Sequence, residues 1–167
     1  FEKDTWRGPV WVNTAYAVIL GLERYGFHEA AAELAYRLCD GVYRTYANCR
    51  RIYEFYDPER FDTKELNRKL GNRFKLITLG NKPRPEFVGW SGLVNTLVIE
   101  HLIGFRRDEG HRIIQPRFPE AAVGRAYSLR LPSEAMSIDV EIVPGQHARG
   151  AVRSTDGVRY FEAECGD

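Results

Sequence analysis

The sequence predicts a mainly α-helical fold followed by a small antiparallel β unit, because the spacing of apolar residues changes along the chain. In three stretches before Gly104, apolar residues recur at steps of three and four, which is the period of an α-helix. Beyond Gly104 they alternate with polar residues, which is the period of a β-strand. We therefore expect two domains, residues 1–104 and residues 105–167.

The first two helices are expected to form an αα-hairpin. One helix runs over residues 13–25, with Asn13 or Thr14 as a plausible N-cap and Gly26 as a left-handed stop. The second helix runs from about residue 28 toward residue 46 and has apolar residues on one face. Since the two are separated by only two residues, they should lie antiparallel.

A third helix is expected over residues 91–103, where nearly every face is apolar, so the helix should be buried. The strand pattern follows it. Apolar and polar residues alternate between Met136 and Ile142, and Asp156-Gly157 is typical of a hairpin turn. Further short strands are expected over residues 113–114, 127–131 and 159–163.

Composition excludes several classes of protein. The chain has 167 residues, of which 44% are hydrophobic, so it can bury a core. With 24 basic and 23 acidic residues, it lacks the excess positive charge of a nucleic-acid-binding protein. It also contains no run of 18 apolar residues, so we expect no membrane span and no membrane partner.

Cysteine and histidine spacing predicts neither disulfides nor a metal site. The 3 cysteines are an odd number, and the 4 histidines are isolated from one another. We expect no metal and no cofactor. The small number of cysteines favours a reducing, cytoplasmic compartment. The chain begins with Phe1, and we expect it to be part of a longer polypeptide.

Three motifs carry the chemistry. The chain opens with Trp6-Arg7-Gly8-Pro9-Val10-Trp11, which sets two indole rings and a guanidinium around a rigid turn. Such a turn suits stacking on sugar rings, anchoring of a partner protein, or simple packing at a helix entrance. Residues 52–58, Ile-Tyr-Glu-Phe-Tyr-Asp-Pro, set carboxylates among aromatic rings. Gly89-Trp90-Ser91 precedes the third helix.

In this order, the three motifs resemble the C-terminal half of the catalytic domain of glycoside hydrolase family 63. The resemblance extends to the mannosylglycerate-hydrolase-like group and, more distantly, to trehalases, and it covers roughly residues 1–104. It implies the C-terminal part of an (α/α)6 barrel. It also implies an inverting hydrolase acting on α-glucosides or α-mannosides, such as glucosylglycerate or mannosylglycerate.

The resemblance implies that Glu54 is the general base, because it matches the glutamate of the family's second motif. An inverting hydrolase needs a second carboxyl group as general acid. In the family this is an upstream aspartate that nothing in this chain matches, so we expect the chain alone to be catalytically incomplete. The candidate sugar-binding residues are Trp6, Arg7, Trp11, Asn13, Tyr56 and Trp90. For each of them a packing role remains open, and Asn13 is better suited to capping a helix than to binding a sugar.

Other functions remain open. The chain could be a carbohydrate-binding or assembly module that kept the aromatic motifs and lost turnover. A phosphorylase would use Arg50-Arg51 to bind phosphate, and a lyase would use Tyr53 or Tyr56 as its base. The charged connection over residues 57–86 is longer than in the family, which leaves the sugar unidentified. The expected partners are a carbohydrate substrate and either the upstream polypeptide or another copy of the chain.

Overall fold

Two compact units divide the chain. The structure is a computed structural model that describes residues 3–4, 7–68, 74, 77–78, 80–145 and 147–165. One unit comprises Phe1–Gly21 and Arg37–Asn95, and the other comprises Leu22–Tyr36 and Thr96–Asp167. The expected domain boundary at residue 104 stays a prediction.

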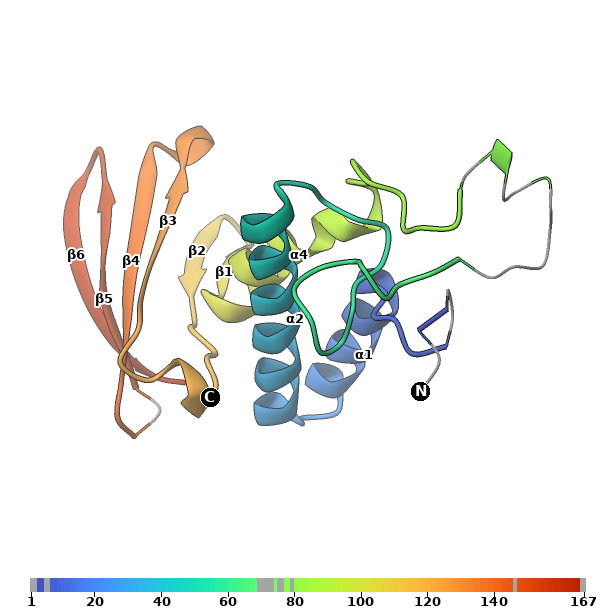
Figure 1. Ribbon diagram of the computed structural model, residues 1–167. Coiled ribbons are helices and arrows are strands. Elements are labelled where there is room, and N and C mark those ends of the chain that lie inside the picture. Colours follow the sequence, from blue (N-terminus) through green and yellow to red (C-terminus); the bar gives the residue numbers. More distant parts are fainter. Residues whose placement is uncertain are drawn as a thin grey trace. The chain divides into compact units, whose positions relative to one another are not determined.

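The αα-hairpin is confirmed. Helix α1 spans Val12–Arg24 and helix α2 spans His28–Cys49, and a tight turn joins them (Figure 1). In that turn Gly26 has a φ of 81°, a left-handed conformation that suits glycine. The backbone N–H of Phe27 donates to the carbonyl of Leu22 over 2.8 Å, which closes the end of α1.

The expected cap of α1 is wrong. The helix begins at Val12, so Asn13 and Thr14 both lie inside its first turn. The Thr14 hydroxyl donates backward over 2.9 Å to the carbonyl of Trp11, the residue before the helix, so it does not accept a backbone N–H as an N-cap would.

The third helical stretch exists but is not one α-helix. It consists of a 3₁₀ turn, η1 (Trp90–Gly92), a short α-helix, α4 (Leu93–Thr96), and a π-helical segment, η2 (Leu97–Leu102). The expected burial holds for Val94, Leu97 and Leu102, whereas Asn95 is exposed. The prediction of a regular helix was therefore wrong in its type, since only α4 is α-helical.

Six strands follow in two antiparallel sheets of the described chain. β1 (Phe105–Asp108) pairs with β2 (His111–Ile114), and the other four form a meander in the order β3-β4-β5-β6 (Figure 1). The meander strands are β3 (Ala126–Leu131), β4 (Met136–Val143), β5 (His147–Ser154) and β6 (Gly157–Glu164). Short 3₁₀ turns cover Glu120–Ala122 (η3) and Pro132–Glu134 (η4).

The alternation predicted for β4 is confirmed, because its side chains alternate between buried and less buried positions along the strand. One face of the sheet forms the core of the second unit. On that face Tyr127 stacks on Phe118 with ring centroids 4.6 Å apart, and its hydroxyl lies 3.3 Å from that of Tyr36 in α2. The buried residues of β4 on this face are Met136, Ile138, Val140 and Ile142.

The prediction of a mainly α fold, and with it of part of an (α/α)6 barrel, is wrong. The described residues form a mixed α and β structure, in which helices α1, α2 and α4 share the chain with the two sheets. The prediction extended one αα-hairpin into a repeating architecture, although no second regular hairpin follows it among the described residues. The antiparallel strands that were expected after Gly104 are present.

None of the described helices combines the length and the apolar run that crossing a bilayer requires.

Candidate functional site

The first two motifs meet in the first unit. Val10 and Tyr56 form an antiparallel bridge, with N–H to carbonyl distances of 2.8 and 2.9 Å in the two directions. This bridge sets the helix entrance beside the segment that carries Glu54. The Trp11 ring, which is buried, then stacks on Phe55 with centroids 5.0 Å apart.

The third motif completes this aromatic cluster. The Trp90 ring lies 5.6 Å from that of Trp11 and 4.4 Å from that of Phe87, and it packs against a buried core that includes Leu66. Trp11, Phe55 and Trp90 therefore form one packed cluster from three separate parts of the chain. Much of their ring surface is used for packing.

Glu54 is buried, and both its backbone N–H and its backbone carbonyl form hydrogen bonds. Only 9% of the residue is exposed. Its N–H donates to the carbonyl of Arg84 over 3.1 Å, and its carbonyl accepts the Trp90 Nε1–H over 2.8 Å. The position of the Glu54 backbone therefore depends on Trp90, one of the candidate sugar-binding residues.

The Glu54 carboxylate pairs with Arg68, a residue of the long connection. The side chains of Glu54 and Arg68 are 11% and 19% exposed, so solvent screens the pair little. The Arg68 Nε–H donates to the carbonyl of Lys82 over 3.0 Å, and its backbone N–H donates to the carbonyl of Asn81 over 2.7 Å. Burial and the nearby charge of Arg84 lower the pKa of Arg68.

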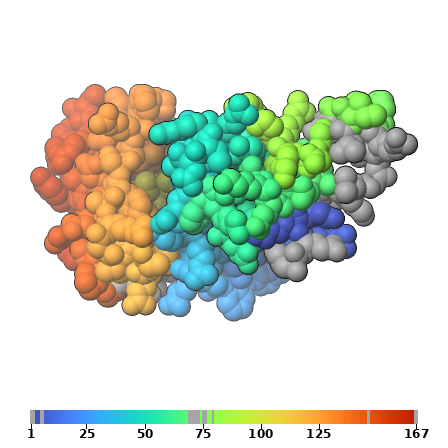
Figure 2. Space-filling view, in the orientation of Figure 1, coloured from blue at the N-terminus to red at the C-terminus, as the bar shows by residue number. Residues whose placement is uncertain are grey.

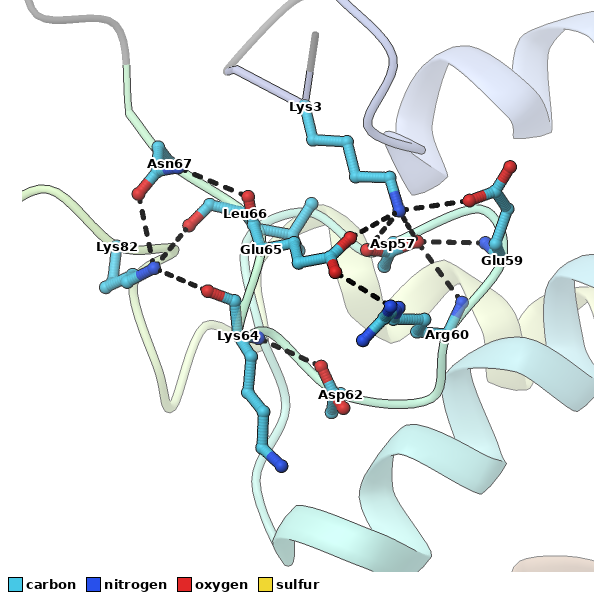
Figure 3. Close-up of polar contacts among 10 residues, drawn as sticks. All are labelled: Lys3, Asp57, Glu59, Arg60, Asp62, Lys64, Glu65, Leu66, Asn67 and Lys82. Atoms are coloured by element: carbon cyan, nitrogen blue, oxygen red, sulfur yellow. Dashed lines mark hydrogen bonds and ion pairs between the residues drawn. The ribbon is translucent and has the colours of Figure 1, made fainter. Parts of the chain in front are cut away.

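Lys82 closes the connection that places Arg68. Its ammonium donates to the carbonyls of Lys64 and Leu66, over 2.7 and 3.1 Å, and to the side-chain oxygen of Asn67 over 3.2 Å (Figure 3). The two ends of this loop are thus tied together directly beside Arg68.

The Lys3 ammonium pairs with Asp57, the carboxylate that follows Glu54 in the second motif. The Lys3 ammonium lies 3.0 Å from Asp57 and 3.1 Å from both Glu59 and Glu65 (Figure 3). In the space-filling view, the dark-blue N-terminal residues lie directly against the green segment after Tyr56 (Figure 2). The Asp57 side chain has no exposed surface.

Asp57 also organises its own turn. One of its carboxylate oxygens accepts the backbone N–H groups of Glu59 and Arg60, over 2.9 and 3.2 Å. Burial acts to raise the pKa of Asp57, but these amides and the Lys3 ammonium lower it below its ordinary value. These contacts give Asp57 a structural, turn-forming role.

The tyrosines of the second motif are used in the local structure. The Tyr56 hydroxyl accepts the backbone N–H of Tyr53 over 3.1 Å, and the Ser91 hydroxyl donates to the Tyr53 carbonyl over 2.6 Å. Burial raises the pKa of Tyr56. A raised pKa disfavours the phenolate that a lyase base would need.

The candidate residues are only partly brought together. Trp11, Tyr56 and Trp90 surround the segment of Glu54. The Arg7 side chain is 63% exposed, and its Nη2 lies 3.4 Å from the carboxylate of Asp4. Trp6 lies outside the described residues.

Asn13 lies in the first turn of α1. Its side-chain oxygen is buried and has no hydrogen-bond partner among the residues that the structure describes.

Sequence reasoning missed Arg68 and Lys3. Each is one basic residue among several in a charged stretch or a short terminal segment, and no local pattern separates it from its neighbours. The length of the connection was the only signal that pointed toward Arg68.

Comparison with known proteins agrees with the motifs. Residues 2–68 match the model of the mannosylglycerate hydrolase MGH1-like glycoside hydrolase domain. We refer to residues 2–68, which are similar to that domain, as the MGH1-like segment. The resemblance to glycoside hydrolases that the motifs indicated is thereby confirmed.

A mannosylglycerate hydrolase of Rubrobacter radiotolerans is 42% identical to this chain over 55 residues. These residues make up 32% of the chain and 11% of that enzyme, so the match spans a small part of the relative. No solved structure matches the chain.

The MGH1-like segment contains both members of the Glu54–Arg68 pair and both members of the Lys3–Asp57 pair. Trp90 and the strands lie beyond it. Among the described residues, no three His, Cys, Asp or Glu side chains gather in a way that could hold a metal ion.

Proposed function

We propose that the chain is part of an inverting glycoside hydrolase that acts on α-glucosides or α-mannosides, with Glu54 as the general base. The observation that carries the proposal is the buried position of the Glu54 carboxylate, held beside a guanidinium within the MGH1-like segment. A general base must be ionised and rigidly aimed at its water, and a neighbouring cation favours the ionised form.

The rest of the site supports binding of a sugar ring. Trp11, Tyr56 and Trp90 lie around the segment of Glu54. Trp11 and Tyr56 are buried, whereas Trp90 is partly exposed, so Trp90 is the best placed of the three to stack on the apolar face of a sugar. Arg7 has a largely exposed guanidinium, which can donate to hydroxyl groups of the sugar or to a carboxylate on the leaving group. Trp6 and Asn13 complete the proposed set of binding residues.

The general acid, in this proposal, comes from another segment. Inversion requires two carboxyl groups roughly 6.5–9.5 Å apart, so that a water fits between the base and the sugar. Asp57 is engaged by Lys3 and by two amides, which leaves it poorly suited to donate a proton. An upstream part of the polypeptide, or another copy, would therefore supply the acid.

The Glu54–Arg68 ion pair favours an alternative function, a non-catalytic carbohydrate-binding or assembly module. Arg68 donates a hydrogen bond to a carboxylate oxygen of Glu54, and this contact would weaken the carboxylate as a base. A carbohydrate-binding or assembly module would tolerate this contact at no cost. This second function predicts sugar binding without turnover.

The test uses the full-length polypeptide that contains this chain, as wild type and as Glu54→Gln. Each is incubated with α-glucosides and α-mannosides, including glucosylglycerate and mannosylglycerate, and the product anomer is followed by NMR. We expect the β-anomer from the wild type and a loss of turnover of about 10³-fold or more in the variant.

Glu65→Gln is a matched control, because it removes an exposed carboxylate of the same connection. Unchanged turnover in Glu54→Gln would rule out its role as the base. Sugar binding without turnover by the wild type would favour the binding module.

A further inference from the structure

The four-stranded sheet of the second unit has a second face, opposite the one that forms the core. Because side chains alternate along a strand, Asp139 in β4 belongs to this outer face, whereas its neighbours Ile138 and Val140 are buried on the inner one. An open hollow of about 710 Å³ lies across the outer face. We refer to it as the sheet hollow. Its lining includes one residue from each strand in register, Ser128, Asp139, Ala151 and Tyr160, and in the neighbouring row Arg149 and Glu162.

Tyr160 lines this hollow with most of its surface in solvent. The residue is 81% exposed, and Ala151, its partner in β5, is too small to cover the ring. On the inner face of the sheet, the Phe161 ring packs over Gly150, where a Cβ built on the glycine would lie 2.8 Å from that ring. This packing holds β6 in place next to Tyr160, so the tyrosine ring is exposed at a defined position.

Two oriented guanidinium groups lie on either side of Ala151, which forms the floor of the hollow. The Arg149 Nε donates to Glu141 over 2.9 Å, and the Arg153 Nε donates to Asp139 over 3.3 Å. Ala151 lies between the two arginines on the same face and is only 5% exposed. The four charged side chains are between 44% and 61% exposed. They can therefore still bind a ligand that approaches from solvent.

The charges on the outer face argue against a layer of protein as its cover. Packing a helix or a second sheet on this face would remove both ion pairs from water, and the desolvation penalty of such pairs can exceed their attraction. A sheet face that packs against protein carries mainly apolar side chains instead. The ion pairs therefore favour a polar occupant.

The same charges argue against a polyanion such as a nucleic acid. Each of the two guanidinium groups is already paired with a carboxylate, and Glu162 adds a further negative charge to the hollow. The described residues of this face thus lack the excess of positive charge on which binding of a polyanion depends.

A neutral sugar fits each of these features. The apolar face of a pyranose ring can stack on Tyr160, and its hydroxyl groups can donate to the carboxylates and accept from the guanidinium groups. The volume of the hollow also lies within the range of about 300–1,000 Å³ that is usual for small-molecule sites. We propose that the sheet hollow binds a neutral oligosaccharide. Since the hollow and Glu54 belong to different units of the chain, this proposal does not rest on the proposed function.

The experiment uses the full-length polypeptide that contains this chain, with Glu54→Gln as background so that Glu54 does not hydrolyse the probe. The polypeptide is labelled with 3-fluorotyrosine and titrated with maltotriose or an α-linked mannotriose. The fluorine NMR signal of Tyr160 is identified by its absence from Tyr160→Phe. We expect this signal to shift saturably with the neutral sugars, and not with trigalacturonate, an anionic trisaccharide of similar size.

Two variants of β6 test the polar contacts with the same signal. Glu162→Ala removes a carboxylate of the hollow and should raise the dissociation constant about tenfold, which corresponds to one lost hydrogen bond. Glu164→Ala is the matched control, because Glu164 is exposed two residues further along the same strand but does not line the hollow. Its dissociation constant should equal that of the background polypeptide.

Two tyrosine variants test the stacking, with total sugar binding measured by saturation-transfer difference NMR. Tyr160→Ala should lose the sugar binding of this hollow, whereas Tyr160→Phe keeps the ring and should retain it. Tyr25→Ala is the control, since Tyr25 is 80% exposed but lies outside the hollow, and binding should not change. Without the Glu54→Gln change, Tyr160→Ala should leave turnover of a small glycoside unaltered, which separates this site from the proposed base.

Three outcomes would overturn the proposal. The first is a Tyr160 signal that does not shift, or shifts linearly without saturation, with both neutral sugars. The second is equal sugar binding in Tyr160→Ala and in the background polypeptide. The third is saturable binding of trigalacturonate but of neither neutral sugar, because that would make the hollow an anion site.

Discussion

Arg68 pairs with Glu54 across 14 residues of sequence, and both side chains are largely buried. Removing one member of a buried pair leaves the other charge without compensation. We therefore expect Arg68→Met to lower the free energy of unfolding by on the order of 3 kcal/mol, measured by urea denaturation. The double variant Glu54→Gln with Arg68→Met should recover part of this loss.

Arg51→Met is the control for this prediction. The Arg51 side chain is 57% exposed, and its contact with Glu86 over 3.5 Å lies at the surface. The expected change is within about 0.5 kcal/mol. An Arg68→Met variant as stable as the wild type would show that the pair adds no stability.

The Asp57 carboxylate makes stability depend on pH. Because its pKa is lowered in the folded protein, the unfolded chain binds more protons at acidic pH. Its contribution is therefore complete above its unfolded pKa, near 4, and is lost as the pH falls through its folded pKa. Asp57→Asn should cost about 2 kcal/mol at neutral pH, where it removes charge-assisted hydrogen bonds, and less as the pH falls.

Asp62→Asn is the comparison variant for Asp57→Asn. Asp62 also accepts a backbone N–H, that of Lys64 over 2.9 Å, but no ion pair holds it among the described contacts. Urea denaturation between pH 7 and pH 3 should show a smaller cost at pH 7 for Asp62→Asn. A cost of Asp57→Asn that grew toward acidic pH would mean that folding raises the pKa of Asp57, the opposite of what its contacts imply.

Gly104, which precedes β1, is expected to tolerate no side chain. Its φ is 72°, and a Cβ built on it would lie 1.8 Å from the backbone carbonyl oxygen of Gln115. Gly104→Ala should therefore combine left-handed strain with a steric clash, at a total cost of roughly 3 kcal/mol or more. Thermal unfolding would measure the change.

Gly124→Ala separates the two causes. Gly124 has a similar φ of 79°, but nothing lies within 4 Å of the added Cβ. This variant should cost only about 1–2 kcal/mol, from backbone strain. Equal losses in the two variants would mean that the backbone around Gln115 moves aside without cost.

Trp90 supports the segment of Glu54 in two ways, which two substitutions can separate. Trp90→Phe keeps an aromatic ring beside Trp11 and Phe87 but removes the donor to the Glu54 carbonyl, so it should cost about 1–2 kcal/mol. Trp90→Ala also removes the packing and should cost about 3–5 kcal/mol. Urea denaturation, followed by far-ultraviolet circular dichroism, would compare the two.

Tyr160→Ala is the matched aromatic control, since Tyr160 is 81% exposed on β6. It should change stability by less than about 0.5 kcal/mol. Similar losses in Trp90→Phe and Trp90→Ala would indicate that the hydrogen bond accounts for the whole effect.

Individual helices and strands could be predicted where apolar residues recur at a regular spacing within one segment. The pattern around α1 and α2 predicted the hairpin, and the alternation from Met136 to Ile142 predicted β4. The fold class failed because it depends on how elements combine. A single αα-hairpin does not determine what packs beside it.

Part of the candidate site was also visible in advance. The order of the three motifs indicated a glycoside hydrolase, which the match of residues 2–68 supports, whereas the catalytic role of Glu54 stays a prediction. For Trp11 and Trp90 the sequence left sugar contact and packing both open. The structure uses both rings in packing, and Trp90 also donates to the Glu54 carbonyl. Sequence alone does not separate a stacking ring from a packed one, since both are apolar and planar.

The sequence by itself determined the helical and strand periods and the family to which residues 2–68 are related, because these depend on neighbouring residues and on motif order. Only the tertiary structure decided which charges meet. Arg68 reaches Glu54 because Lys82 ties the connection closed, and Lys3 reaches Asp57 across 54 residues. Contacts between residues so far apart in sequence depend on packing and charge pairing in three dimensions. The helix and strand propensities of neighbouring residues do not determine them.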